Sequence, residues 1–591
     1  MPSLQFKGKA LVQNHHLVVP FHELKAVKAK GLSAKPSLHE NLVVHGDNLK
    51  ALKALLPYYH GAVKCIYIDP PYNTGNERWV YNDAVNSPMM KDWIGTVVDR
   101  EDLTRHDKWC CMMMPRLRLL REFLTDVGVI MMSIDDHEAH HARCLLNEVF
   151  GEENFVAQLV WEKGRKNDAK LFSVGHEYIL LYARSSSRLR ELGTTWREAK
   201  PGAAEIQEEY LRLKKQFGTS NSKIETALGE FYKNLPKGHP SKKHARYSHV
   251  DDRGVWRDDN MSWPGGDGPT YEVLHDKTGK PCAVPEGGWR YATPEKMQEM
   301  IKKGFVEFRE DHTKPPIRKT YLVRIGSEGD ELEEIDEEED DVGIQVAGSY
   351  FYRSALQASR VLAGIFGKKV FENPKDHEVL ARLIRYATGN DKEALVLDAF
   401  AGSGSTGHAV LQLNQEDRGS RKFILIEGDD TAWEITSERI RRVIKGVPKS
   451  KDAALRKGLG GSFSFFEVGN AMRLETLLKG DKLPRYEDLA GYVFYTATGE
   501  EFDRDAIKRK TGFIGESSKY DVYLFYEPDL DYLKKTALTL ELAHALPRGS
   551  GKPRLVFAPT KYLDSLHLDQ LRIEFCQLPF EIYKAIRPKK A

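Results

Sequence analysis

The 591-residue sequence lacks several features that would place the protein in common classes. It has no run of about 18 apolar residues, so no membrane-spanning helix is expected. Its six cysteines form no C-x-x-C pair and show no zinc-ligand spacing, so no metal centre is predicted. Cys110 and Cys111 are adjacent in an apolar run, and we expect buried free thiols of the kind that persist in a reducing cytoplasm.

Two further absences narrow the possible activities. The sequence has no G-x-x-x-x-G-K-[ST] pattern, which excludes a P-loop ATPase, and no nuclease motif is recognisable. Residues 1–20 contain no apolar stretch typical of a signal peptide, so a cytoplasmic protein is expected.

The net charge of +2 hides a strong segregation of charge along the chain. Residues 328–341 contain 11 acids and no base, and such a run predicts a solvated loop. The rest of the chain therefore carries an excess of positive charge that suits contact with a polyanion.

Apolar runs and helical patterns alternate in two separate blocks of the chain. This alternation predicts an α/β fold with a doubly wound parallel sheet and an antiparallel edge. The predicted strands are residues 42–45, 62–68, 128–134, 155–161, 177–182, 394–397 and 422–426.

Between the two blocks the alternation stops, and this segment is too long for an ordinary connection. After the second block, strand candidates occur at residues 491–495, 521–526, 554–557 and 572–575. The predicted division is an N-terminal extension, a first half of the sheet domain, an insertion, a second half and a C-terminal interaction domain: residues 1–40, 41–185, 186–349, 350–447 and 448–591.

The first chemical motif, Asp69-Pro70-Pro71-Tyr72, directly follows a predicted buried strand. The Asp69 carboxylate and the Pro70 carbonyl can accept both hydrogens of an exocyclic amino group and aim its lone pair. The proline pair stiffens the turn, and Tyr72 can stack on the face of a base. The alternative is a plain tight turn in an unrelated α/β protein.

The second motif starts at Asp398 and continues as Phe400-Ala401-Gly402-Ser403-Gly404-Ser405-Thr406 between a predicted strand and a predicted helix. Gly402 and Gly404 let the backbone approach a nucleoside-bearing cofactor. Asp398 would accept a hydrogen bond from a cofactor amine, and Thr406 belongs to the same site.

Glu427 ends the next predicted strand, where a carboxylate can bind ribose hydroxyls. The glycines at 402, 404 and 407 also fit G-x-G-x-x-G, so a nicotinamide or flavin site remains an alternative by pattern alone.

The segment from Ile66 to Gly75 resembles the catalytic motif of type III restriction–modification Mod subunits. The Phe-x-Gly-x-Gly loop from Phe400 to Gly404 resembles the S-adenosylmethionine loop of the same beta-class amino-group DNA methyltransferases. The resemblance implies a Rossmann-like methyltransferase sheet with permuted motif order, a large target-recognition insertion and a small α/β C-terminal domain. In this family, Asp at the position of Asp69 accompanies adenine N6 methylation and Ser accompanies cytosine N4 methylation.

The resemblance also implies further cofactor contacts. Asn373 and Lys375 match the residues that touch the methionine end of the cofactor, although the family usually has proline where this chain has Asp376. Asp47 matches a carboxylate that binds the adenine of the cofactor. The alternative for Asp47 is a simple helix N-cap.

Two groups of cations are candidates for contacts with DNA phosphates, and the alternative for the first group is a solvated loop. They are Lys163, Arg165 and Lys166 after one strand, and Lys242, Lys243 and Arg246 in the insertion. The expected partners are double-stranded DNA, a second copy of the chain and a separate helicase–nuclease restriction subunit, with no membrane contact.

Three alternatives remain open: methylation of cytosine N4, methylation of RNA, and a catalytically silent DNA-binding subunit. Every interpretation in which the protein is an enzyme requires the two motifs, which are far apart in the sequence, to meet at one edge of a shared sheet.

Overall fold

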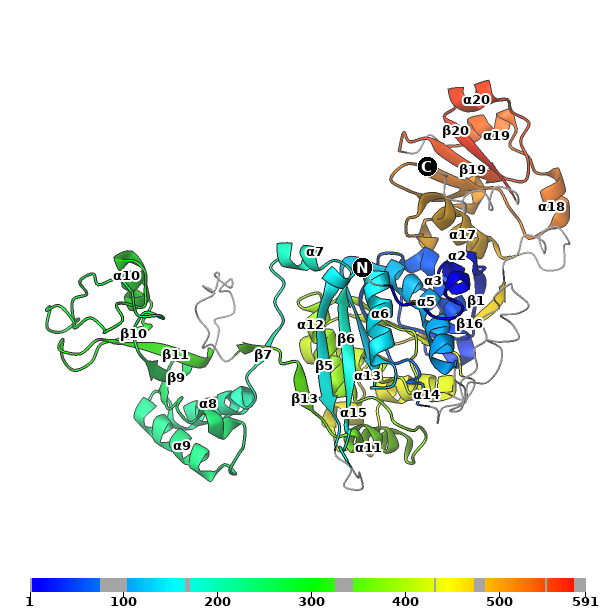
Figure 1. The fold of residues 1–591 in the computed structure, drawn as a ribbon. Coiled ribbons are helices and arrows are strands. Elements are labelled where there is room, and N and C mark those ends of the chain that lie inside the picture. Colours follow the sequence, from blue (N-terminus) through cyan, green and yellow to red (C-terminus); the bar gives the residue numbers. More distant parts are fainter. Residues whose placement is uncertain are drawn as a thin grey trace. The chain divides into compact units, whose positions relative to one another are not determined.

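The computed structural model describes most of the chain and divides it into two compact units (Figure 1). The first unit is Met1–Thr194 with Ser349–Ala591, and the second is Thr195–Gly348. The described residues are 3–74, 104–164, 171–324, 344–429, 432–471, 484–547 and 550–578.

A ten-stranded mixed sheet forms the centre of the first unit, in the order β1-β16-β2-β15-β14-β3-β4-β6-β5-β13. Every neighbouring pair from β16 to β4 is parallel. Strand β6 runs antiparallel between β4 and β5, and β1 is an antiparallel edge strand. The bounds in sheet order are His22–Ala26, Ser464–Ala471, Leu42–His45, Lys422–Glu427, Leu395–Asp398, Val63–Ile68, Leu124–Ile134, His176–Ala183, Phe155–Glu162 and Tyr350–Tyr352.

Helices cover both faces of this sheet, which confirms the predicted doubly wound α/β fold. Ile66 and Ile68 of β3 share one hydrophobic core with α3, α5 and α6. Helix α12 lies against β3, and α13 and α14 lie against β15. Strands buried on both faces have continuous apolar sequences, which is why they could be predicted. These helices are α3 (Asn48–Tyr59), α5 (Arg105–Phe123), α6 (Ala139–Phe150), α12 (His377–Thr388), α13 (Ser405–Asp417) and α14 (Ala432–Lys445).

Short helices complete the sheet layer at its periphery. They are α1 (Lys9–Val12), α2 (His15–Val18), α7 (Ser186–Glu191), α11 (Ala355–Phe366) and α15 (Ala453–Lys457).

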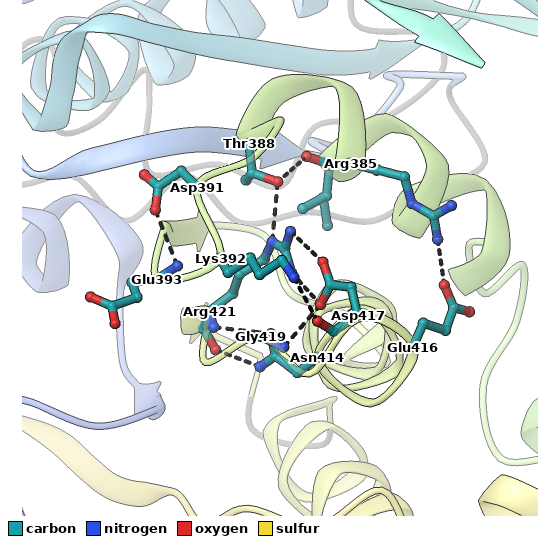
Figure 2. A network of polar contacts seen from close by, with 11 residues as sticks. Arg385, Thr388, Asp391, Lys392, Glu393, Asn414, Glu416, Asp417, Gly419 and Arg421 are labelled. Carbon is teal, nitrogen blue, oxygen red and sulfur yellow. Dashed lines mark hydrogen bonds and ion pairs between the residues drawn. The ribbon is translucent and has the colours of Figure 1, made fainter. Parts of the chain in front are cut away.

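A polar network fixes the amino end of β15 against two helices (Figure 2). The buried Arg421 side chain donates to the Thr388 hydroxyl at the end of α12 (3.1 Å) and to the Asp417 carboxylate at the end of α13 (3.0 Å). Asn414 hydrogen-bonds both the N–H and the carbonyl of Arg421, at 2.9 and 2.8 Å. The network therefore sets where β15 begins.

The second unit contains a four-stranded antiparallel sheet packed on two helices, α8 (Ala203–Phe217) and α9 (Asn221–Asn234). Trp289 is fully buried in a second small core beside α10 (Pro294–Lys302), as expected for a structural tryptophan. The strands of the four-stranded sheet and of a separate pair are β10 (Val306–Glu307), β11 (Ile317–Arg324), β9 (Gly254–Asp259), β8 (His249–Asp251), β12 (Ile344–Val346) and β7 (Arg197–Ala199).

The C-terminal part of the first unit has its own sheet, ordered β17-β18-β19-β20. The strand predicted at residues 491–495 is wrong, because this apolar run belongs to helix α17 (Tyr486–Thr498). A short apolar run fits a buried helix as well as a buried strand. The remaining elements are β17 (Phe513–Glu516), β18 (Asp521–Leu524), β19 (Arg554–Ala558), β20 (Ile573–Gln577), α18 (Leu530–Lys535), α19 (Leu540–Ala545) and α20 (Ser565–Gln570).

The first and the last of the predicted segments, residues 1–40 and 448–591, each contribute a strand to the main sheet. Strand β16 lies within residues 448–591 yet pairs in parallel with β2, and β1 lies within residues 1–40 yet pairs with β16. The extension and the start of the C-terminal segment therefore complete the sheet domain.

None of the helices in the described ranges has the length and apolar character needed to cross a bilayer. All six cysteines are free, and Cys110 and Cys111 are buried on α5, as predicted.

Replacing Arg421 by Met should lower the free energy of unfolding by about 2–4 kcal/mol, because Thr388 and Asp417 lose their buried partner. Arg385→Met is the matched control: its pairing with Glu416 is largely exposed and should contribute under about 1 kcal/mol. Urea denaturation followed by circular dichroism measures both, and equal losses would contradict the role of Arg421.

Candidate active site

The two predicted motifs meet at one edge of the main sheet. Strand β3 ends at Ile68 and β14 ends at Asp398, and the two strands are parallel neighbours. Tyr72 and Phe400 pack against the same hydrophobic core. The convergence that the sequence argument requires is therefore confirmed.

Helix α5 and the start of α6 hold the loop that carries Asp69 and Tyr72. The indole Nε1 of Trp109 donates to the Pro71 carbonyl at 2.7 Å. Asn73 has a left-handed backbone (φ 60°), and its amide donates to the buried Glu138 carboxylate at 2.5 Å. The loop is thus fixed on both sides of Tyr72.

Glu138 also hydrogen-bonds the Nδ1 atoms of His106 and His141, at 2.6 and 2.7 Å. The three side chains could together offer ligands to a metal ion. Both carboxylate oxygens already have protein partners, so the cluster is complete as a support for Asn73.

Four ionisable side chains of alternating charge surround Tyr72. Asp69 Oδ2 lies 2.7 Å from the Lys375 ammonium, which is 3.7 Å from Glu177. Glu177 also pairs with Lys163 at 2.6 Å and accepts the Tyr72 hydroxyl at 3.0 Å. The other oxygens, Asp69 Oδ1 and Glu177 Oε1, are buried with no hydrogen-bond partner in the described part of the chain.

Burial and the neighbouring charges shift the pKa values of several of these side chains. Burial lowers the pKa of Lys375, but Asp69 and Glu177 outweigh burial and raise it overall. Burial raises the pKa of Glu177, yet Lys375 and Lys163 bring it below its usual value. Burial and the Asp69 carboxylate raise the pKa of Tyr72, so its hydroxyl stays protonated. Burial and the neighbouring Lys375 ammonium lower the pKa of Lys163.

The loop after β14 is organised by two carboxylates. Asp398 accepts from the Phe400 N–H at 3.0 Å and from the Thr406 hydroxyl at 2.5 Å. Glu427 accepts from the Gly402 N–H at 2.6 Å. Burial raises the pKa of Asp398 to about 7 and also raises that of Glu427.

The loop has the shape of a cradle for a nucleoside. Gly402 and Gly404 have positive φ angles of 51° and 75°, which disfavour other residues. A Cβ on Gly404 would lie 3.2 Å from the Thr436 carbonyl, and one on Gly402 would lie 3.4 Å from the Phe371 ring. Helix α13 begins at the loop and directs its positive end there. Together with the carboxylate of Asp398, these features fit a cofactor with hydroxyl and amino groups.

Asp47 is the N-cap of α3, where it accepts from the Lys50 N–H at 3.1 Å, and it also lies 3.4 Å from Arg116. Its neighbour Asn48 donates to the carbonyl of Ala399 at 3.0 Å. The N-cap alternative for Asp47 is therefore confirmed. The cap also places its carboxylate beside the loop at 398–404.

The remaining predicted residues are spread over both units. Asn373 is exposed with a left-handed backbone, and Lys163 pairs with Glu177. In the second unit, Lys243 and Arg246 are exposed, whereas the Lys242 ammonium bonds the Leu235 carbonyl at 2.7 Å. The residues outside the described ranges are Arg165, Lys166 and the acidic segment 328–341.

Sequence reasoning missed Glu177, Glu138 and Arg439. Glu177 opens an otherwise apolar strand, and this single acid was the available signal. Arg439 lies on α14 and donates to Ser403 and Ser405 of the cofactor-side loop. Glu138 and Arg439 lie in ordinary amphipathic helical sequence, so nothing local marked them.

A doubly wound sheet that joins Asp-Pro-Pro-Tyr to a glycine loop, in this order, is the arrangement of a Rossmann-like methyltransferase. The model of a family described as DNA methylase matches residues 63–438, and the chain belongs to this family. The enzyme is a DNA methyltransferase, and its methyl donor is S-adenosylmethionine.

Curated relatives are similar over most of the chain. The Mod subunit of the type III enzyme EcoP15I of Escherichia coli is 28% identical over 77% of this chain and 70% of its own length. The StyLTI Mod subunit of Salmonella typhimurium is 30% identical over 74% of this chain and 62% of its own length. The type II methyltransferase M.KpnI of Klebsiella pneumoniae is 29% identical over 69% of this chain and 85% of its own length.

Solved structures are only loosely similar as whole chains. The PvuII cytosine-N4-specific DNA methyltransferase has a TM-score of 0.31 and 10% identity, covering 68% of this chain and 87% of its own. M1.HpyAVI with S-adenosylmethionine has a TM-score of 0.27 and 11% identity, covering 68% and 98%. These scores carry no part of the family assignment.

The raised pKa of Asp398 predicts a pH-dependent stability difference. The folded protein binds this proton more tightly than the unfolded chain, so the stabilisation is lost as pH rises through about 7. Asp398→Asn imitates the protonated form. Its unfolding free energy, relative to the unmodified protein, should therefore rise by about 3 kcal/mol between pH 5 and pH 8. Chemical denaturation across this range measures the difference, and parallel pH profiles would contradict it.

Proposed function

We propose that this protein methylates adenine N6 in double-stranded DNA and is the modification subunit of a type III restriction–modification system. One observation carries the chemistry: the buried, unpartnered Asp69 Oδ1 lies at the same sheet edge as the glycine loop at 402–404. The type III assignment rests on the relatives named above as Mod subunits.

Adenine is favoured over cytosine by the aspartate at position 69, as the family resemblance implies. A poor nucleophile such as an aromatic amine reacts only when its lone pair is correctly aimed. Asp69 and the Pro70 carbonyl would each accept one hydrogen of the amino group, which leaves the lone pair facing the donor site. The rigid Pro70-Pro71 turn keeps these two acceptors at a fixed separation.

When bound, S-adenosylmethionine supplies an electrophilic methyl group on its sulfonium sulfur. Asp398, Gly402, Gly404 and Glu427 would hold its nucleoside part. As the amino nitrogen gains positive charge, the Asp69 carboxylate stabilises that charge and can accept the released proton. Tyr72 would stack on the everted base, and its hydroxyl bond to Glu177 fixes the orientation of the ring.

The proposed partners are double-stranded DNA, a second copy of the chain and a separate restriction subunit, in the cytoplasm. The exposed cations Lys243 and Arg246 of the second unit are candidates for phosphate contacts. The Mod relatives extend beyond the matched region, since the alignments cover 62% and 70% of their lengths.

A second candidate is a stand-alone type II modification enzyme, because M.KpnI is covered over 85% of its length. Catalytic chemistry is the same in both cases. Co-expression with a type III restriction subunit, followed by size-exclusion chromatography, distinguishes them, since a type III Mod subunit should elute in a stable complex.

Asp69→Ala should reduce methyl transfer to DNA by about a hundredfold or more, because one of the two amino acceptors and the compensating charge are lost. Binding of S-adenosylmethionine, measured by calorimetry, should stay within about threefold. Asp126→Ala is the control, since Asp126 is an exposed residue near the start of β4, at the opposite edge of the sheet. Full activity of Asp69→Ala would refute the proposed role.

The modified base is identified by mass spectrometry of nucleosides from DNA of cells that express the protein. N6-methyladenine is expected, and it should disappear with Asp69→Ala. N4-methylcytosine would refute adenine specificity while leaving the amino-methyltransferase chemistry intact. Methylation confined to RNA, or absent with intact cofactor binding, would support the RNA and catalytically silent alternatives respectively.

A further inference from the structure

We infer that Lys375 reads the ring nitrogen beside the target amino group, with Asp69 and Glu177 holding its ammonium in place for that contact. The inference rests on the proposed function and adds the base-discriminating residue that the sequence did not supply.

The Lys375 ammonium is held between two carboxylates. The residue is 8% exposed, and its Nζ atom is held by Asp69 Oδ2 at 2.7 Å and by Glu177 Oε2 at 3.7 Å. The same Nζ lies 4.9 Å from the centre of the Tyr72 ring. The donor therefore lies over the Tyr72 ring, close to the aromatic group on which the base would stack.

The carboxylates of Asp69 and Glu177 keep this ammonium protonated. Two carboxylates and two lysines alternate as Asp69, Lys375, Glu177 and Lys163, with the Lys375 ammonium between Asp69 and Glu177. A buried ammonium persists only when such partners compensate its desolvation. Removal of Glu177 would leave Lys375 with Asp69 alone.

Asp69 and Lys375 together present an acceptor next to a donor. Asp69 Oδ2 is engaged with Lys375, whereas Oδ1 is buried without a partner among the described residues. An amino hydrogen can bond Oδ1 while Lys375 stays on Oδ2 and donates one of its other two protons outward. The pair thus matches a base edge that offers a donor and then an acceptor.

Adenine and cytosine have this edge, because each has an amino group next to an unprotonated ring nitrogen. At the corresponding position thymine, and guanine at O6 and N1, have the reverse pattern of a carbonyl next to a ring N–H, which would oppose donor to donor and acceptor to acceptor. Lys375 would therefore disfavour thymine and the carbonyl edge of guanine, while the choice between adenine and cytosine lies elsewhere in the site.

The inference is tested on duplexes that carry the modified site with adenine, 1-deazaadenine or 7-deazaadenine at the target position. In 1-deazaadenine a C–H replaces N1, the ring nitrogen that Lys375 would contact. In 7-deazaadenine a C–H replaces N7, which lies on the other side of the amino group. Single-turnover methylation by the unmodified protein should fall about 10- to 100-fold with 1-deazaadenine, the range expected for one hydrogen bond from a charged donor. The rate with 7-deazaadenine should stay within about threefold of that with adenine.

The Lys375→Met variant, assayed with adenine and with 1-deazaadenine, completes a double-mutant-type cycle in which one change is made in the protein and the other in the base. It should lower the rate on adenine by a similar factor and lose nothing further on 1-deazaadenine, because the contact is already absent. Lys369→Met is the matched control, since Lys369 is exposed and pairs only with the exposed Glu372 in the described structure; its rates should be those of the unmodified protein.

Two results would overturn the inference. One is equal methylation of adenine and 1-deazaadenine by the unmodified protein, which needs no variant to fold. The other is a Lys375→Met protein that binds S-adenosylmethionine more than about tenfold more weakly and still discriminates against 1-deazaadenine, which would assign Lys375 to the carboxylate of the donor. Failure to methylate adenine at all would overturn the proposed function as well.

Discussion

The parallel pairing of β3 with β14 is the constraint on which the rest of the site depends. Each strand delivers an aspartate to the same edge, Asp69 from one block of sequence and Asp398 from the other. Parallel strands require long crossover connections, so the inserted second unit can lie between the two blocks without disturbing their pairing. The two motifs are therefore far apart in the sequence but follow neighbouring strands of the sheet.

Next to this pairing, the side chains of Lys375 and Glu177 are buried and still form ion pairs. Glu177, Lys163 and Lys375 compensate one another, so Asp69 has a counter-ion without losing its second oxygen as an acceptor. An isolated carboxylate in such a place would favour its neutral form. The carboxylate of Asp398 shows this contrast: among the described residues it accepts from the Phe400 N–H and the Thr406 hydroxyl and pairs with no cation, and its pKa rises to about 7.

The sequence predicted those parts of the site that follow a buried parallel strand, because a continuous apolar run ending in a polar residue is a local pattern. Asp69, Asp398 and Glu427 were found in this way. Glu177 was not found, because its role depends on the antiparallel placement of β6 next to β4. This placement brings the Glu177 carboxylate within hydrogen-bond distance of the Tyr72 hydroxyl. Helix α17 was predicted as a strand because a five-residue apolar run has no resolvable period.

The departure from the family pattern at Asp376 also has a physical explanation. Asp376 caps α12 through the N–H groups of Glu378 and Val379 and pairs with Arg353 at 3.0 Å. Arg353 immediately follows β13, the strand on which the chain returns from the second unit and pairs with β5. A proline at 376 could supply neither contact. The aspartate therefore ties the returning chain to the start of α12, directly after Lys375 in the sequence.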